Sequence, residues 1–297
     1  MEQAIEQNKE QEYTTIIKPK SGLLEIDFKE LWRYRDLCML FVKRNIITQY
    51  KQTILGPLWF LIQPAMTTIM YMVVFGGIAG IPTDGVPKPL FYLAGTCMWQ
   101  YFASCLNNTS NTFVSNSGIF GKVYFPRLIM PVASVISNLL RLGIQFSFFV
   151  IVYIVYSITD PTCHAHLTWF ALMFPILIAM MAGLALGFGT IISSMTTKYR
   201  DLQVLFSFLV SLWMYATPIV YPLSQTESKF FLGVPVHTFM CLNPVTPVIE
   251  TFKYGFLGCG EFVGWRWLIY SFVFMVILLA SGIVVFNKVQ KSFMDTV

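Results

Sequence analysis

Charged residues are scarce in this chain of 297 amino acids. Only 12% are Asp, Glu, Lys or Arg, which is about half the share of an ordinary soluble domain, whereas 56% are hydrophobic. The mean hydropathy is +0.63. This composition excludes a soluble globular protein and indicates several membrane spans. The net charge of +5 then reflects membrane topology rather than nucleic-acid binding.

Motifs for nucleotide binding and for common hydrolases are missing too. No G-x-x-x-x-G-K-[ST] phosphate loop occurs, and the glycine-rich run at 183–190 lacks the Lys that would reach a phosphate; its small residues instead predict close helix packing. No H-E-x-x-H zinc motif, nucleophile elbow or C-x-x-C pair is present. We expect no catalytic site, metal site or cofactor in this chain, and an energy source in another protein.

Six apolar windows are long enough to cross a bilayer, for which a helix needs about 20 residues. Helices are expected because backbone groups that face lipid must be hydrogen-bonded within one segment. The sequence thus predicts an all-α polytopic membrane protein with six transmembrane helices in a domain that spans 57–297. The windows are 57–80, 90–110, 132–157, 167–195, 202–221 and 267–286.

The charges between the windows predict the orientation. Fifteen Lys and Arg residues fall on the side that holds both termini, and four fall on the other side. The positive-inside rule therefore places both termini in the cytoplasm. The first residues form a polar head, 1–26, that contains acids where a signal peptide would be basic and apolar, so we expect no cleavage there.

Residues 27–56 combine apolar and basic side chains at roughly helical spacing. Trp32, Leu40 and Phe41 are among the apolar ones, and Arg33, Arg35 and Asp36 are among the charged ones. This pattern predicts an amphipathic helix in the cytoplasmic interface, which could also dock a partner.

The connection between the fifth and sixth windows is too long for a simple turn. Its part from 236 to 258 is apolar, is interrupted by Pro244 and Pro247, and has about half the length of a span. Such a stretch predicts a re-entrant segment at the outer side. A disulfide between Cys241 and Cys259, or a metal site in the P-T-C-H-A-H run at 161–166, is left open by the sequence.

Arg141 is the one charged residue within the six windows. Such a residue either faces a polar path or extends toward the interface, and both readings stay open. Because no acid lies in the windows, a lipid head group or a sugar phosphate is a candidate counter-ion. The missing acids also count against an ion-coupled transporter.

Several motifs, taken in order, resemble the membrane subunit of ABC transporters that export cell-surface polysaccharide, such as O-antigen, teichoic acid and capsule. The resemblance extends from about residue 27 to the C-terminus. The motifs are RYRDL at 33–37, QYKQTILGPLWFLIQP at 49–64, GKVYFPRLIMP at 121–131, TTKYRDL at 196–202, ATPIVYP at 216–222 and LNP at 242–244.

The resemblance implies a homodimer in the bacterial inner membrane that moves a lipid-linked polysaccharide. A separate ATPase subunit would bind ATP and magnesium. The loop 118–127 would couple to that subunit: Lys122 and Arg127 would meet its polar groups, Tyr124 and Phe125 would form an apolar anchor, and Pro126 would end a short helix. That loop also contains Gly121. Substrate-channel candidates are Trp59, Phe60, Tyr71, Arg141, Trp213 and Tyr215.

Two other functions remain open at this stage. One is a drug or lipid exporter permease of the same superfamily, which ordinarily lacks the F-P-R and K-Y-R-D loops present here. The other is a membrane-bound glycan ligase or acyltransferase, which would need reactive groups in the outer loops. The available residues for such a site are His164, His166, Glu227, His237 and Glu250.

Overall fold

A computed structural model of the chain describes residues 28–51, 55–120, 122–123, 125–160, 165–199, 201–226, 230–231, 233–260 and 262–296. Several of the predictions above concern residues outside this part of the chain. These are the polar head 1–26 and Gly121, Tyr124, Cys163, His164 and Glu227.

The described residues are mostly helical, with one short antiparallel strand pair at one end. In chain order the elements are α2 (Phe28–Arg33), α3 (Arg35–Tyr50), η2 (Gly56–Leu58), α4 (Trp59–Tyr71), the π-helix η3 (Met72–Ile78), α5 (Lys88–Ser110), α6 (Thr112–Phe120), α7 (Ile129–Thr159), η4 (Trp169–Met173), α8 (Phe174–Thr196), α9 (Leu202–Tyr215), η5 (Leu223–Thr226), β1 (Phe230–Phe231), β2 (Val234–Pro235), α10 (Val236–Leu242), α11 (Thr246–Leu257) and α12 (Trp265–Thr296).

Each predicted window contains a helix, which confirms the all-α membrane class. Among the described residues, four helical stretches are long and apolar enough to cross a membrane: Trp59–Ile78, Ile129–Thr159, Trp169–Thr196 and Trp265–Gln290. The helix in the fifth window, α9, is apolar but shorter. The helix in the second window, α5, is long but carries more polar side chains.

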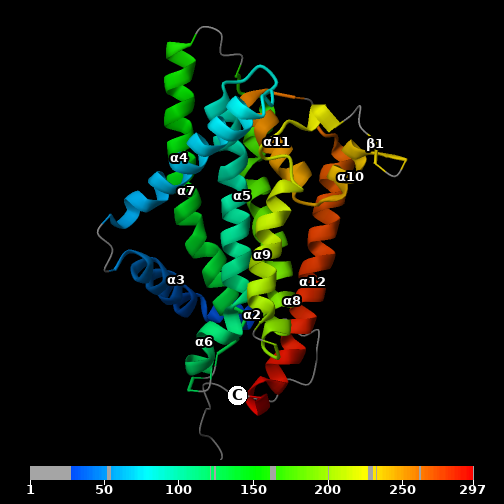
Figure 1. Ribbon diagram of the computed structural model, residues 1–297. Coiled ribbons are helices and arrows are strands. Elements are labelled where there is room, and N and C mark those ends of the chain that lie inside the picture. The colour runs from blue at the N-terminus through cyan, green and yellow to red at the C-terminus, as the bar shows by residue number, and fades with distance from the viewer. Residues whose placement is uncertain are drawn as a thin grey trace, which may run out of the picture.

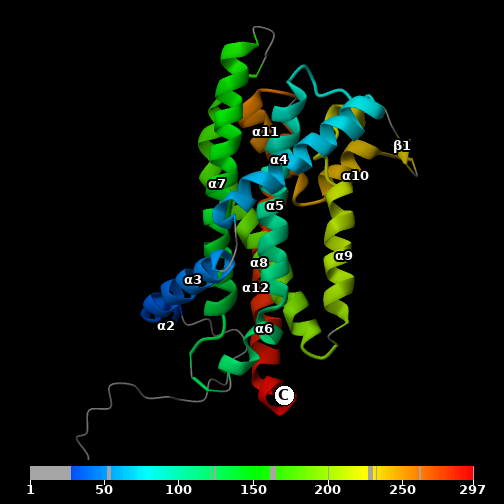
Figure 2. The ribbon, with the colours of Figure 1, turned by 60° about the vertical axis from the view of Figure 1, so that its left-hand side comes forward.

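α5 lies at the centre of the bundle, between α7 and α8 (Figures 1 and 2). Every residue from Leu90 to Trp99 is buried. Because protein rather than lipid surrounds it, α5 can contain hydroxyl and amide side chains that a lipid-facing helix would expose at a cost. This explains why α5 is less apolar than its neighbours.

The glycines of α8 allow the close helix packing that the sequence predicts. A Cβ atom at Gly189 would clash with the Oγ1 atom of Thr109 on α5. On the opposite side, a Cβ atom at Gly187 would lie 2.9 Å from the Cγ atom of Leu278 on α12. α8 therefore packs directly against α5 and α12, as small residues permit in membrane helices.

The helix α4 crosses the upright helices obliquely (Figures 1 and 2) and contacts α5 and α7. Pro64 lies within it. Most of its surface is not covered by the rest of the chain, as the exposed side chains of Met66, Ile69 and Met70 show. Such an apolar surface suits contact with lipid or with another membrane subunit.

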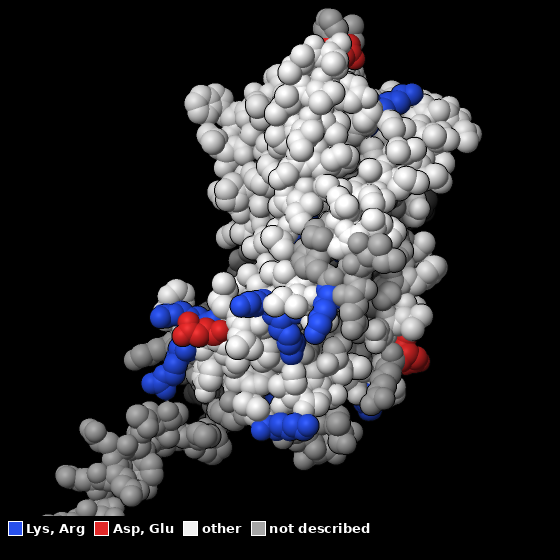
Figure 3. Space-filling view, turned by 90° about the vertical axis from the view of Figure 1, so that its left-hand side faces the viewer, with Lys and Arg blue, Asp and Glu red and all other residues white. Residues whose placement is uncertain are grey.

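The two ends of the bundle differ in composition. One end holds α6, the turn before α7 and the C-terminal end of α12, and the other holds α10, α11 and β1 (Figure 1). Lys and Arg side chains gather over α2 and α3 around the lower part of one face, below a surface with few charges (Figure 3). The cations on this face therefore lie mainly at the end of the bundle that holds α2 and α3.

Candidate functional site

The turn between α6 and α7 packs against α3 through aromatic side chains. Phe125 is only 4% exposed, and its ring centroid lies 5.6 Å from that of Phe41 on α3 and 5.8 Å from that of Phe120 on α6. In the same cluster, Phe113 of α6 stacks on Phe286 of α12 with a centroid distance of 4.5 Å. The cluster therefore joins α3, α6 and α12 to the turn.

Arg127 connects the same turn to the last helix. Its Nη1 atom donates a 2.8 Å hydrogen bond to the carbonyl oxygen of Gln290, and its guanidinium lies 5.4 Å from the ring centroid of Phe120. Partial burial lowers the pKa of Arg127 from its usual value.

These contacts correct two details of the expected coupling loop. Phe125 is a core residue here, so it does not offer an apolar anchor on the surface. Pro126 does not end a helix: α6 ends at Phe120, and the carbonyl oxygen of Pro126 accepts a 3.0 Å hydrogen bond from the backbone N–H of Ile129 as α7 begins. Among the residues of the turn that the structure describes, Lys122 and Val123 are exposed.

The interfacial segment forms two helices, α2 and α3, that are joined at Tyr34. Arg33, Arg35 and Asp36 are exposed, with 3.8 Å between the Nε atom of Arg35 and the Oδ1 atom of Asp36. α3 packs on α7, where Phe41 is buried, and leaves Leu40 on its outer side. This pattern fits a helix held between the bundle and a membrane surface.

Arg141 contacts polar groups of two other helices. Its Nη2 atom donates a 2.9 Å hydrogen bond to the Oε1 atom of Gln63 on α4, and its Nη1 atom donates a 3.2 Å bond to the Oγ atom of Ser104 on α5. The guanidinium also lies 5.2 Å from the ring centroid of Phe60. A second polar contact joins α7 and α5 one turn away. Gln145, four residues after Arg141, donates a 2.6 Å hydrogen bond to the Oε1 atom of Gln100, four residues before Ser104.

The predicted channel residues do not form one group. Phe60 and Arg141 lie together. The ring of Trp213 is partly buried and packs against the core, with its centroid 5.3 Å from that of Phe102 and 5.2 Å from that of Phe188. Trp213 is therefore a packing residue in this structure. Of the remaining candidates, Trp59 and Tyr215 are exposed, and the hydroxyl of Tyr71 lies 3.2 Å from the Sδ atom of Met214.

A buried ion pair holds α11 at the opposite end of the bundle. The Nζ atom of Lys253 lies 3.0 Å from the Oε1 atom of Glu250 and donates a hydrogen bond to the carbonyl oxygen of Pro218. The same ammonium lies 4.1 Å from the ring centroid of Phe91 on α5. Lys253 thus joins α11, α5 and the segment after α9.

The cysteines and histidines described in this region do not form a reactive group. Cys241 and Cys259 are buried free thiols, so no disulfide joins them in this structure. The Sγ atom of Cys241 lies 3.8 Å from the Nε2 atom of His237. Within the described part of the chain, no cluster of three or more His, Cys, Asp or Glu residues could hold a metal ion.

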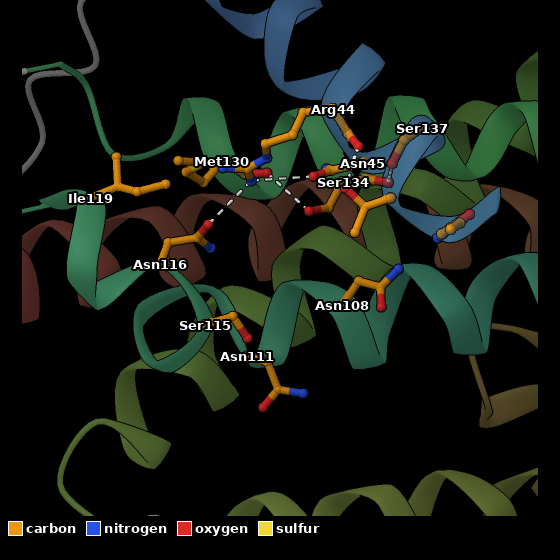
Figure 4. Close-up of a pocket in the computed structure, with 12 residues that line it drawn as sticks. Arg44, Asn45, Asn108, Asn111, Ser115, Asn116, Ile119, Met130, Ser134 and Ser137 are labelled. Carbon is orange, nitrogen blue, oxygen red and sulfur yellow. Dashed lines mark hydrogen bonds between the residues drawn. The ribbon is translucent and has the colours of Figure 1, made fainter. Parts of the chain in front are cut away.

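A polar pocket of about 550 Å³ lies between α3, α5, α6 and α7 (Figure 4). The pocket was not predicted from the sequence, although the polar runs N-N-T-S-N at 107–111 and S-N-S at 115–117 contribute several of its lining residues. Among the described residues that line it, Arg44 alone is charged. The lining residues are Arg44, Asn45, Thr48, Gln49, Asn108, Asn111, Ser115, Asn116, Ile119, Met130, Ser134 and Ser137.

Comparison with known proteins identifies one family over most of the chain. The family model for the ABC-2 type transporter matches residues 36–257. The chain is 24% identical over 226 residues to the O-antigen export system permease protein RfbA of Myxococcus xanthus, which covers 76% of this chain and 82% of the relative.

Two further relatives show the same likeness. An O-antigen export system permease protein RfbA of Klebsiella pneumoniae is 24% identical over 260 residues, which covers 88% of this chain and 94% of the relative. The polysialic acid transport protein KpsM of Escherichia coli is 21% identical over 214 residues, which covers 70% of this chain and 76% of the relative.

Proposed function

Because the chain belongs to the ABC-2 type transporter membrane family, we propose that it is the transmembrane permease subunit of an ATP-driven exporter of cell-surface polysaccharide. The observation that carries this proposal is the family match over residues 36–257 together with relatives named for O-antigen and polysialic acid transport. The substrate is a polysaccharide linked to a lipid, and the chain provides its path.

ATP hydrolysis belongs to a separate subunit in this proposal. The sequence contains no phosphate-binding loop, and the family's membrane subunits work with an ATPase partner that binds ATP and magnesium. The permease has no catalytic site of its own. It converts nucleotide-driven movement of the partner into helix movement.

The proposed topology has six spans in the bacterial inner membrane, with both termini in the cytoplasm. Four of the spans are the long apolar helices named above, and α5 and α9 are the other two. α5 can cross the membrane although it is less apolar, because other helices surround it. The segment 236–258 forms the helix pair α10 and α11 at the outer end, where we propose that it re-enters the membrane beside the substrate path.

The turn before α7 transmits movement of the ATPase to the bundle. Lys122 and Val123 are exposed there and are available to a partner surface, whereas Phe125 connects the turn to α3 and Arg127 connects it to α12. A partner that moves this turn therefore moves the interfacial helix and the last span with it. Arg33, Arg35 and Asp36 on α2 and α3 give the partner a second exposed surface.

Two copies of the chain are proposed to enclose the path. The uncovered apolar surface of α4 suits a subunit contact, and Trp59, Phe60 and Tyr71 on the same first span are positioned to border the path. Tyr215 is exposed on α9 and is a further candidate. Arg141 provides a cation at the inner part of the path for phosphate or sugar groups.

A co-purification experiment tests this function. The tagged chain is extracted gently from its own host membrane, and mass spectrometry is used to search for a nucleotide-binding ATPase. Recovery of that ATPase is expected, and Lys122→Glu should weaken it in a salt-dependent way. Arg266→Glu makes the same charge change at the opposite end and serves as the control. Absence of an ATPase under conditions that preserve other ABC complexes would contradict the proposal.

A further inference from the structure

The polar pocket between α3 and α7 holds a guanidinium in a fixed position. The Nη2 atom of Arg44 donates a 3.4 Å hydrogen bond to the Oδ1 atom of Asn116 and a 3.2 Å bond to the Oδ1 atom of Asn45. The guanidinium also lies 4.8 Å from the ring centroid of Phe41. Figure 4 shows the Arg44 side chain extending toward Asn116, with a dashed line between the two. The aromatic face and the amides thus hold the charge in place.

The charge of Arg44 is not neutralised within the described part of the chain, where no Asp or Glu forms an ion pair with it. Its partners are neutral amide oxygens at 3.2 and 3.4 Å, which are longer than the usual distance of a charge-assisted bond. A half-buried guanidinium with only neutral partners attracts an anion, and its fork of N–H donors fits phosphate oxygens.

The pocket is also large enough for a sugar group attached to the phosphate. Its volume of about 550 Å³ falls in the range of small-molecule sites. Asn108 and Ser115 line the pocket and are exposed. Neither side chain forms a hydrogen bond with another described residue. Amide and hydroxyl groups of this kind can both donate to phosphate oxygens and bind sugar hydroxyls.

Polar residues on α5 and α7 connect the pocket with Arg141. On α7, Ser137 of the pocket lies four residues before Arg141, and on α5, Asn108 of the pocket lies four residues after Ser104, which accepts a bond from Arg141. Residues four apart share a helix face one turn apart. A polar stripe therefore runs between α5 and α7 from the pocket toward the bilayer interior.

We propose that this pocket binds the phosphorylated head group of the lipid that carries the exported glycan, with Arg44 as the anion-binding residue. The pocket lies beside α3. Because α3 is proposed to lie in the membrane interface, the proposal also places the pocket at the level of the lipid head groups. Binding there precedes movement along the stripe to Arg141. This inference rests on the proposed function.

Binding to the purified complex tests the proposal. The full chain with its co-purified ATPase is placed in neutral phosphatidylcholine vesicles, and the affinity for radiolabelled polyprenyl diphosphate is measured. We expect Arg44→Gln to weaken binding about tenfold or more, because a charge-assisted pair is lost, and Arg44→Lys to lose less. Lys43→Gln removes one charge from the adjacent, exposed position outside the pocket and should leave binding unchanged.

Competition with unlabelled lipids identifies the source of the phosphate. Unlabelled polyprenyl diphosphate should displace the probe, whereas polyprenol, which lacks phosphate, should not. Displacement by polyprenol would overturn the assignment of a phosphate site. Equal displacement by phosphatidylglycerol would overturn the assignment to the glycan carrier, because the pocket would then bind any phosphate head group of the bilayer.

A second variant distinguishes a loss of binding from a folding defect in Arg44→Gln. Asn108→Asp adds a carboxylate at an exposed position of the pocket and should weaken binding of the probe while the ATPase still co-purifies. Unchanged affinity in both Arg44→Gln and Asn108→Asp would overturn the pocket proposal and leave the exporter function standing. Loss of the ATPase from the unmodified chain would instead remove the proposed function.

Discussion

Arg127 and Gln290 are 163 positions apart in the chain, yet the Nη1 atom of Arg127 donates a 2.8 Å hydrogen bond to the carbonyl oxygen of Gln290. The bond ties the turn before α7 to α12, and the burial of Phe125 beside Phe41 ties the same turn to α3. A force applied to this turn therefore reaches both α3 and α12. This arrangement gives the proposed coupling a physical route.

Phe125→Asp should abolish export while the chain still inserts into the membrane. The substitution puts a carboxylate into an aromatic cluster, where an unpaired charge costs several kcal/mol or forces the turn away from α3. Surface polysaccharide and the amount of chain in the membrane fraction are measured together. Phe125→Leu keeps an apolar side chain and should retain most export. Normal surface polysaccharide in Phe125→Asp would show that the turn does not need this contact.

Arg127→Ala should uncouple ATP hydrolysis from export, because it removes the bond between the turn and α12. The ATPase activity of the complex should persist while export falls several-fold. Arg127→Lys can still donate to the carbonyl oxygen of Gln290 and should lose less. If export and hydrolysis fall in proportion in Arg127→Ala, the residue affects assembly rather than transmission.

Arg141→Gln should reduce export strongly, since it removes the cation between Gln63 and Ser104. Arg141→Lys keeps the charge but not the two-point contact, so an intermediate rate is expected. Export is followed as the rate at which new polysaccharide reaches the cell surface, at matched chain levels. An unaltered rate in Arg141→Gln would exclude a contribution of this charge to the path.

Lys253→Met should destabilise the outer end, because it leaves Glu250 buried without its partner. Removing one partner of a buried ion pair typically costs about 3–5 kcal/mol. The midpoint of thermal unfolding in detergent is expected to fall clearly. The double variant Lys253→Met and Glu250→Gln should recover part of the loss, and a double variant no more stable than the single one would contradict this explanation.

Much of the helical framework can be predicted from the sequence, because a span needs a long apolar window and charge marks its ends. The close approach of Gly189 to Thr109 follows from the small residues of α8. The central position of α5 could not be predicted in this way, since its polar side chains are tolerated only after other helices surround it.

Less of the candidate site could be predicted from the sequence. Phe125 and Trp213 were expected at a docking surface and a channel, but both are packed against other aromatic rings. An aromatic side chain has the same identity in a core and at a surface, so only tertiary contacts separate the two. The pocket around Arg44 unites segments more than 60 residues apart, which no local pattern reveals.

Reconstituted transport tests the central claim most directly. The chain and its co-purified ATPase are placed in sealed vesicles that contain lipid-linked polysaccharide on the outer leaflet, and the protected fraction is measured with time. Our account predicts that this fraction rises with ATP and magnesium, and does not rise with ATP alone or with a permease that lacks the ATPase. A protected fraction that stays constant in the presence of an ATP-hydrolysing complex would contradict the exporter assignment.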